Sequence, residues 1–376
     1  MSSLSNIRKN ELRELIPALQ NKKYFNYGGQ GPLPSPSLKA IQNSWEEIQE
    51  LGPFTNDVWP YVMKEITTTK RYLAKICGVS ASHIALTENV TSGCILPIWG
   101  IPFSADDRIL ISDCEHPGII AACKELAHRK KLHIDVLKVQ QLRNGANNRD
   151  ITRALLIQNL KDSLKPRTKL VVLSHILWNT GQIIPIEAVS QTLKNHGNKP
   201  FLLVDAAQSF GQIPIKKAVA SSDIYAFTGH KWACGPEGLG GMAVSDRILK
   251  EGNPTFIGWR SLQTEEGIYI NSPNPFHMDA RRFEIATSCI PLLAGLRCSL
   301  DLLEKEGTEE KRLKKIQSLS LKIWEGLNES GKIHTILKGP PPAGLVSFDI
   351  NNEEASISLV KSLGKKRLWI RVLEDP

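Results

Sequence analysis

The sequence lacks the features that mark secreted, membrane-spanning and disulfide-stapled proteins. Its first residues, MSSLSNIRKNELRELIPAL, contain no apolar signal-peptide core. No window approaches the roughly 18 uninterrupted apolar residues of a membrane-spanning helix. The seven cysteines are odd in number and form no CxxC pair, in a chain of 376 residues that is long enough to fold without disulfides. We therefore expect a cytoplasmic protein with free thiols and no membrane partner.

Signatures of nucleic-acid and dinucleotide binding are also missing. The formal net charge is +9, but the basic residues lie in short runs mixed with acids, and no nucleic-acid motif accompanies them. No GxGxxG follows the first expected strand, and GPEGLGG at 235–241 has the wrong context for one. These absences disfavour a nucleic-acid partner and a dehydrogenase, and we predict no metal site. The excess positive charge suits anionic ligands.

The composition is that of a soluble, enzyme-sized protein. Hydrophobic residues make up 41% of the chain and charged residues 23%, and the length allows two domains. Apolar strands alternate with helical segments over residues 62–245, which predicts an α/β fold with a mostly parallel sheet covered by helices on both faces. We expect an N-terminal segment at 1–23, a large domain at 24–288 and a smaller α+β C-terminal domain at 289–376.

One lysine stands in an unusual context. Lys231 lies between the short apolar stretch IYAF and a glycine-rich loop, and Thr228 and His230 precede it. A lysine held against apolar and glycine-rich backbone can lose its proton through desolvation and then condense with an aldehyde as a Schiff base. Lys231 is therefore the first candidate for a catalytic residue.

A carboxylate upstream complements this lysine. The stretch FLLVDAAQSFG reads as a strand buried on both faces of a parallel sheet, and Asp205 stands at its C-terminal end, where open α/β sheets bind ligands. Asp205 precedes Lys231 by 26 residues. Such a pair suits pyridoxal phosphate, because an acid keeps the pyridine nitrogen protonated while a lysine holds the aldehyde.

Several motifs together resemble a known family. VDAAQ and TGHKWACGPEGLGG resemble the class V, or NifS-like, group of fold-type I pyridoxal-phosphate enzymes. NYGGQGPLP, LTENVTSG, EHPG, SHILWNTGQIIPI and RRFEIAT are similar to its cystine/cysteine C-S lyase and isopenicillin-N-epimerase-like branch, and they follow the family order from about residue 24 to 373. The resemblance implies a seven-stranded sheet in the large domain, pyridoxal 5'-phosphate as the cofactor, and a homodimer with shared active sites.

The resemblance also assigns catalytic and cofactor-binding roles. It makes Lys231, Asp205 and His116 the catalytic residues, with the ring of His116 above the pyridine ring. The cofactor-binding residues that it adds are Thr91 and Ser92 at the phosphate, Asn179 and Gln208 as amide donors to the phenolic oxygen, and Thr228 and His230 beside the lysine. Local sequence leaves plainer alternatives open, namely an N-cap at Thr91 and Ser92, a turn at Asn179 and a purely structural histidine.

Substrate-binding residues follow from the same resemblance. Arg371 matches an arginine that grips the substrate α-carboxylate, and Gly29 and Gln30 lie in a loop that closes one side of the pocket. Trp259 is a further candidate, with Arg260 and Thr287, in a region that serves the neighbouring subunit's site. Arg282 and Glu284 match the family's RFE signature, where an internal ion pair is an equal alternative to substrate contact.

The expected reaction is C–S lysis of cysteine or cystine. Lys231 would hold the cofactor and then remove the substrate's α-proton, after which a sulfur on the β-carbon leaves and aminoacrylate hydrolyses to pyruvate and ammonia. A cysteine desulfurase would need a nucleophilic cysteine on a late loop, and no cysteine follows Cys298. Desulfurase activity with an Fe–S assembly protein as sulfur acceptor, epimerase and aminotransferase activities remain alternatives.

The sequence departs from the family pattern at its end. Family members continue beyond LEDP into a strand with a second arginine and a final helix, whereas this chain stops at Pro376. We therefore expect an apparently truncated small domain with an incomplete carboxylate clamp. A cofactor-binding protein without turnover is the corresponding alternative.

Overall fold

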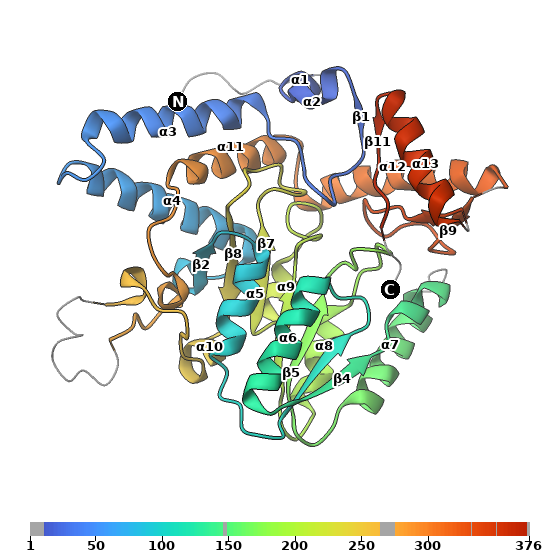
Figure 1. The fold of residues 1–376 in the computed structure, drawn as a ribbon, viewed down its shortest axis with the longest axis horizontal. Coiled ribbons are helices and arrows are strands. Elements are labelled where there is room, and N and C mark those ends of the chain that lie inside the picture. Colours follow the sequence, from blue (N-terminus) through green and yellow to red (C-terminus); the bar gives the residue numbers. More distant parts are fainter. Residues whose placement is uncertain (1–10, 146–148, 264–274, 332, 351, 374–376) are drawn as a thin grey trace.

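The structure, a computed structural model, describes residues 11–145, 149–263, 275–331, 333–350 and 352–373. Its centre is a seven-stranded sheet in the order β2-β8-β7-β6-β5-β3-β4 (Figure 1). The strands are β2 (Ile84–Thr87), β3 (Arg108–Ser112), β4 (His133–Leu137), β5 (Thr168–Ser174), β6 (Phe201–Asp205), β7 (Ile224–Thr228) and β8 (Gly240–Val244). Only β8 runs against its neighbours, which confirms the expected mostly parallel sheet of seven strands.

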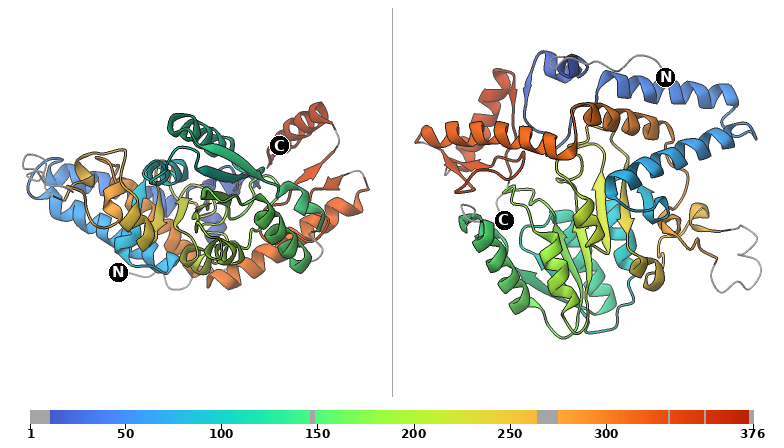
Figure 2. Two further views of the ribbon diagram at one scale, coloured as in Figure 1. Left: turned by 90° about the horizontal axis from the view of Figure 1, so that it is seen from below. Right: turned by 180° about the vertical axis from the view of Figure 1, so that it is seen from behind.

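Helices cover both faces of this sheet. On one face lie α5 (Val90–Trp99), α6 (Pro117–Lys130) and α10 (Asp246–Glu251), and on the other lie α7 (Arg149–Ser163), α8 (Ile186–Lys194) and α9 (Lys216–Ala220). Figure 1 shows α5 and α6 in front of the sheet, and the view from behind in Figure 2 brings the opposite layer forward. Successive strand residues point to alternate faces. Leu202 and Val204 accordingly join one hydrophobic cluster while Phe201 and Leu203 join the other.

Three long helices pack together beside the β2 edge of the sheet. They are α3 (Ser35–Leu51), α4 (Val58–Cys77) and α11 (Pro291–Lys305). A Cβ at Gly295 would lie 2.5 Å from the side chain of Ile41, so the close approach of α11 to α3 requires glycine there. Shorter elements fill the connections: α1 (Glu11–Glu14), α2 (Pro17–Gln20), η1 (Ala81–His83), η2 (Gln140–Gly145), η3 (Trp259–Ser261) and η5 (Ala280–Phe283).

The C-terminal part of the chain is built on two helices. They are α12 (Glu309–Glu329) and α13 (Glu353–Lys365), and α12 extends to one side of the large sheet (Figure 1). Its strands are two residues long: β9 (His334–Thr335) pairs antiparallel with β10 (Phe348–Asp349), while β11 (Leu368–Trp369) pairs parallel with β1 (Lys23–Tyr24). The N-terminal stretch thus forms a strand pair with the C-terminal region. The domain boundaries after residues 23 and 288 stay predictions.

No helix in the described ranges is both long and apolar enough to span a bilayer.

Candidate active site

Lys231 sits in a tight loop directly after β7. The hydroxyl of Thr228 and the ring Nδ1 of His230 lie 2.8 Å apart, and the N–H of Gly31 donates to the carbonyl of His230 at 2.7 Å. A Cβ on Gly31 would lie 2.0 Å from the carbonyl oxygen of Lys231, so only glycine permits this approach. Two loops distant in sequence therefore fix the backbone on which the lysine stands.

The electrostatic surroundings of Lys231 favour a neutral amine. Burial lowers its pKa, the charge of Asp205 opposes this shift, and the guanidinium of Arg371 lowers the pKa further. These interactions require that the three side chains lie within reach of one another. The structure thus brings together three residues that the sequence predicted for one site.

Asp205 ends the neighbouring strand β6. Its carboxylate is 4% exposed, and its Oδ1 accepts a hydrogen bond of 2.8 Å from the N–H of Ala207. Burial raises its pKa, while this hydrogen bond and the charges of Lys231 and His116 lower it. Because β6 and β7 run parallel and adjacent, with Asp205 paired to Ala226, the carboxylate and the lysine loop emerge at the same edge of the sheet.

His116 begins helix α6 at this edge. Its Nδ1 accepts a hydrogen bond of 3.2 Å from the N–H of Gly118, and its ring meets the indole of Trp178 edge-on with centroids 6.0 Å apart. Its side chain is exposed, yet partial desolvation and the charge of Lys231 lower its pKa, which favours the neutral ring. A flat neutral ring in this place fits the stacking role that the sequence predicted.

Thr91 and Ser92 lie in the first turn of helix α5. The N-cap is Asn89, whose Oδ1 accepts from the N–H of Ser92 at 2.9 Å. The alternative that Thr91 or Ser92 is itself the cap is therefore wrong. The positive end of the helix dipole and two hydroxyl groups coincide there, which is an arrangement suited to a phosphate.

The two predicted amide donors are both buried. Asn179 is 5% exposed, and its Nδ2 lies 3.9 Å from the sulfur of Cys114. Gln208 donates to the carbonyl of Gly28 at 2.9 Å and accepts from the indole N–H of Trp232 at 2.8 Å. Gln208 therefore ties the loop around Gly28 to the lysine loop, a role that the sequence did not predict. Its donation to a cofactor oxygen stays a prediction.

Arg371 lies close to the lysine although it comes from the C-terminal part of the chain. Its side chain is exposed by surface area, yet partial desolvation lowers its pKa, with Tyr24 opposing the shift, and its charge lowers the pKa of both Lys231 and His116. The pairing of β11 with β1 places it there, since Tyr24 lies opposite Trp369 and the N–H of Phe25 donates to the Trp369 carbonyl at 2.9 Å.

The predicted loop at Gly29 and Gln30 is a tight turn. Both backbone N–H groups donate to the carbonyl of Asn26 at 3.0 Å, and the carbonyl of Gln30 accepts from the hydroxyl of Tyr24 at 2.7 Å. The side-chain amide of Gln30 donates to the carboxylate of Glu237, which follows the lysine in the glycine-rich loop. The turn is thus joined to the loop that carries Lys231.

Trp259 stands among surface aromatic side chains. Its indole packs edge-on against Trp59 with ring centroids 6.4 Å apart, and Trp59 in turn contacts Phe54 at 5.6 Å. All three rings are exposed, Phe54 to 85%. Thr287 is also exposed. Their service to a neighbouring subunit stays a prediction.

The two charged residues of the RFE signature have different partners in the structure. Glu284 pairs with Lys70 at 2.6 Å and accepts from the N–H of Leu86 at 3.0 Å. Arg282 instead donates to three backbone carbonyls, of His277, Leu249 and Gly252. Glu284 therefore makes an internal ion pair, but with Lys70, and Arg282 is bonded to loop carbonyls instead.

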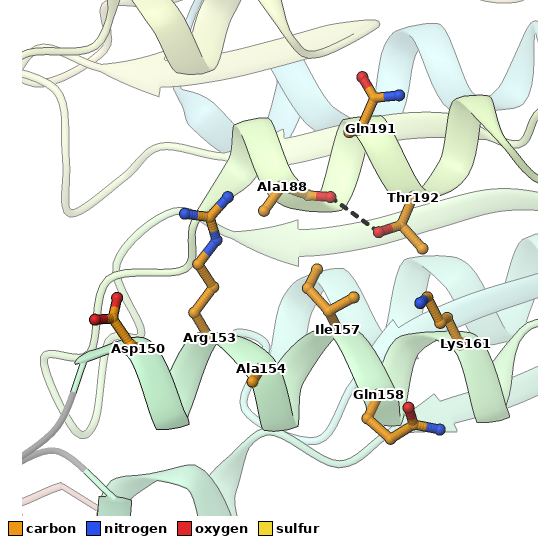
Figure 3. A pocket seen from close by; sticks show the side chains of 9 residues that line it. All are labelled: Asp150, Arg153, Ala154, Ile157, Gln158, Lys161, Ala188, Gln191 and Thr192. Atoms are coloured by element: carbon orange, nitrogen blue, oxygen red, sulfur yellow. Dashed lines mark hydrogen bonds between the residues drawn. The ribbon is translucent and has the colours of Figure 1, made fainter.

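A separate groove lies between α7 and α8 (Figure 3). It is lined by Asp150, Arg153, Ala154, Ile157, Gln158, Lys161, Ala188, Gln191 and Thr192. None of the residues predicted for the site borders it. Within the described part of the chain, no cluster of three or more His, Cys, Asp or Glu side chains could hold a metal ion.

Comparison with known proteins extends over almost the whole chain. The family model described as Aminotransferase class-V matches residues 24–372. A probable cysteine desulfurase of Methanothermobacter thermautotrophicus is 24% identical over 92% of this chain and 82% of its own. The isopenicillin N epimerase of Streptomyces clavuligerus is 25% identical over 62% of this chain and 56% of its own.

Two solved structures of a protein named C-DES share both fold and sequence with this chain. A complex of the cystine C-S lyase C-DES with its reaction product cysteine persulfide is 38% identical, with a TM-score of 0.88, over 96% of this chain and 92% of that one. A lysine-to-alanine mutant of C-DES, with glycine covalently linked to the pyridoxal-phosphate cofactor, is 37% identical with a TM-score of 0.89, over 96% and 91%.

Proposed function

Because this chain belongs to the aminotransferase class V family and is a pyridoxal-phosphate-dependent enzyme, we propose that it catalyses the C–S lysis of cystine or cysteine. The observation that carries the proposal is the likeness to the cystine C-S lyase C-DES, which runs through both the large and the C-terminal part of the chain. The placement of Lys231, Asp205 and Arg371 at one edge of the sheet supports it.

The residues at this edge fit the cofactor. The indole N–H of Trp178 is buried and has no hydrogen-bond acceptor among the described residues, so the site contains a donor suited to a polar ligand. Lys231 would hold the aldehyde, Asp205 would face the ring nitrogen, and the first turn of α5 would hold the phosphate. When bound, pyridoxal phosphate withdraws electrons from the α-carbon of an amino acid.

The chain's own groups then supply positioning and proton transfer. Arg371 binds the α-carboxylate of the substrate with its planar guanidinium. Lys231, whose pKa is lowered by burial, takes the α-proton on Nζ as a neutral amine. Asp205, buried at the end of β6, would keep a proton on the ring nitrogen. The neutral ring of His116 covers the site without adding a charge.

Desulfurase activity is the second candidate, because several curated relatives bear that name. The cysteines argue against it. Five of the seven are buried, Cys298 is half-buried in α11, and Cys289 is exposed just before that helix. The C-terminal part, from which we expect the sulfur-accepting loop, contains no cysteine in the sequence. Transfer of sulfur to an Fe–S assembly protein belongs to this second candidate.

We also propose that the enzyme is a homodimer. The exposed aromatic rings of Phe54, Trp59 and Trp259 support this, because solvent-exposed clusters of large apolar side chains mark interaction surfaces. The cytoplasmic location stays a prediction.

A screen of amino acids would identify the substrate. Purified protein loaded with pyridoxal phosphate should change its visible absorbance on adding cystine or cysteine, and cystine should yield pyruvate and ammonia. Alanine, which has no leaving group on its β-carbon, is the matched control and should give no pyruvate. Formation of alanine and protein-bound sulfur from cysteine would establish a desulfurase instead. Binding of the cofactor without any response to amino acids would contradict turnover.

Arg371→Lys should weaken substrate binding while leaving cofactor binding intact. Lysine keeps the charge but loses the two-pronged donor, so we expect KM for cystine to rise roughly tenfold to a hundredfold, corresponding to about 1.5–3 kcal/mol for a charged hydrogen bond. Arg367→Lys is the control, because Arg367 lies four positions earlier and is not among the residues predicted for the site. Equal KM values for the two variants would remove Arg371 from the substrate site.

A further inference from the structure

A second buried carboxylate lies beside the cofactor site and has no role in the reaction described above. Glu115 immediately precedes His116, just beyond the end of β3, and is 2% exposed. Its Oε1 accepts from the hydroxyl of Ser112 at 2.5 Å and from the N–H of Ser174 at 2.8 Å, and its Oε2 accepts from the Ser174 hydroxyl at 2.7 Å. Glu115 therefore ties the carboxyl ends of β3 and β5 together.

These contacts lead directly to Asp205. Ser174 is the last residue of β5 and is the register partner of Asp205 at the end of β6. The charges of the two acids act on each other, since Asp205 raises the pKa of Glu115. Glu115 also precedes the histidine that begins α6. It thus holds the two strand ends that position His116 and Asp205.

Several other ionisable groups lie near Glu115 and Asp205. Burial and then the charges of both acids raise the pKa of the Cys94 thiol in α5, and burial and then Glu115 raise that of the Cys123 thiol in α6. Burial and then the charge of Asp205 raise the pKa of Tyr225 in β7, and Lys231 and His116, when protonated, lower the pKa of Asp205. Within the described residues, Glu115 forms no ion pair with a lysine, arginine or histidine.

Two neighbouring buried carboxylates are costly unless a cation compensates them. Burial raises the pKa of Glu115 to about 7, with the serine hydrogen bonds opposing the shift. All three contacts of Glu115 are donors, which is an arrangement built for the ionised form. A protonated pyridine ring held against Asp205 would supply the missing positive charge.

We propose that Glu115 is a positioning residue that acts through Asp205 and His116, and whose negative charge reinforces Asp205 in keeping the cofactor's ring nitrogen protonated. The inference rests on the cofactor site of the proposed function but not on which amino acid the enzyme uses.

The first test is Glu115→Gln, which removes the charge while keeping the shape. Removing a nearby negative charge disfavours a bound cation, so the dissociation constant for pyridoxal phosphate should rise about tenfold. The pH midpoint of the bound cofactor's visible absorbance should move down by about one unit. Asp113→Asn is the matched control, because it removes a nearby carboxylate that accepts from the N–H groups of Val139 and Gln140 and leaves Glu115 and its serine donors in place. It should lower stability but leave that midpoint in place.

The cofactor-free protein gives an independent readout. The folded-state pKa of Glu115 is raised from 4.5 to about 7, so the folded state binds more protons than the unfolded state between these values. This contribution to stability is present below the lower value and is lost as the pH rises towards 7. Glu115→Gln should remove this pH-dependent loss of stability. The difference in melting temperature between variant and wild type should therefore change between pH 4.5 and about 7.

The wild-type protein provides the decisive check if the variant does not fold. At pH 6, infrared difference spectra of protein labelled with ¹³C-glutamate should show loss of a protonated glutamate carboxyl when pyridoxal phosphate binds, because the cationic ring lowers the pKa of Glu115. An unchanged glutamate signal, or a Glu115→Gln variant with wild-type cofactor affinity and pH midpoint, would overturn the inference. Failure of wild type to bind the cofactor would instead overturn the proposed function.

Discussion

Lys231→Ala should abolish turnover while leaving a folded protein. Without the amine, no group holds the cofactor's aldehyde or takes the substrate's α-proton, so we expect kcat to fall by at least about 10²–10⁴, the range for loss of a general base. Wild type treated with pyridoxal phosphate and then borohydride should carry the added mass of the reduced cofactor on Lys231. The variant should carry none at this position.

The control for this experiment is Lys217→Ala. Lys217 is an exposed lysine on α9, so its removal should change neither turnover nor the labelled peptide. Labelling of another lysine in the wild type, with Lys231 unmodified, would contradict the assignment of Lys231 as the cofactor-binding lysine. Retention of full activity by Lys231→Ala would also contradict the assignment, because another group would then have to act as the catalytic amine.

Asp205→Asn should be the second most damaging change. The amide cannot hold a proton on the pyridine nitrogen by charge, so the cofactor loses much of its electron-withdrawing power, and we expect kcat to fall by about 10²–10⁴. The amide nevertheless preserves the shape of the side chain at the end of β6. Binding should persist, and the cofactor's visible band should titrate at a lower pH than in wild type.

Asp223→Asn separates this electrostatic role from simple structural damage. Asp223 also joins strands, since it accepts hydrogen bonds of 2.9 Å from the N–H of Leu202 and the hydroxyl of Ser245, but it lies at the opposite end of β6 and β7. Its replacement should lower the melting temperature and spare the cofactor spectrum. If both variants change the spectrum equally, Asp205 has no special relation to the ring nitrogen.

The sheet and its principal residues were predictable because their signals are local. A run of apolar residues ending in Asp205 indicates a buried strand with an acid at its carboxyl end. The glycine-rich loop after Lys231 indicates closely packed backbone, and the structure places Gly235 against Gly229 and Gly240 against Phe227 and Asn89. Adjacent parallel strands then bring the acid and the lysine to one edge.

Other features depend on contacts between distant segments, which a single sequence does not reveal. Glu115 adjoins the predicted His116, yet its partner Ser174 lies 59 residues away. Gln208 meets Gly28 across 180 residues. Glu284 pairs with Lys70 and not with the nearby Arg282, because Arg282 donates its hydrogen bonds to loop carbonyls. The partners of these side chains are determined by packing and by the hydrogen bonds that buried polar groups require, not by their spacing in the sequence.

The strand pair of β1 and β11 has a mechanical consequence. The N–H groups of Lys23 and Phe25 bond to the carbonyls of Arg367 and Trp369, and a few residues later Gly31 bonds to His230. The short segment 26–30 thus connects β1, which pairs with the strand just before Arg371, to the residue that bonds to the loop of Lys231. A displacement of β11 would pull on this segment, so we expect binding of a substrate carboxylate at Arg371 to influence the alignment of the catalytic amine.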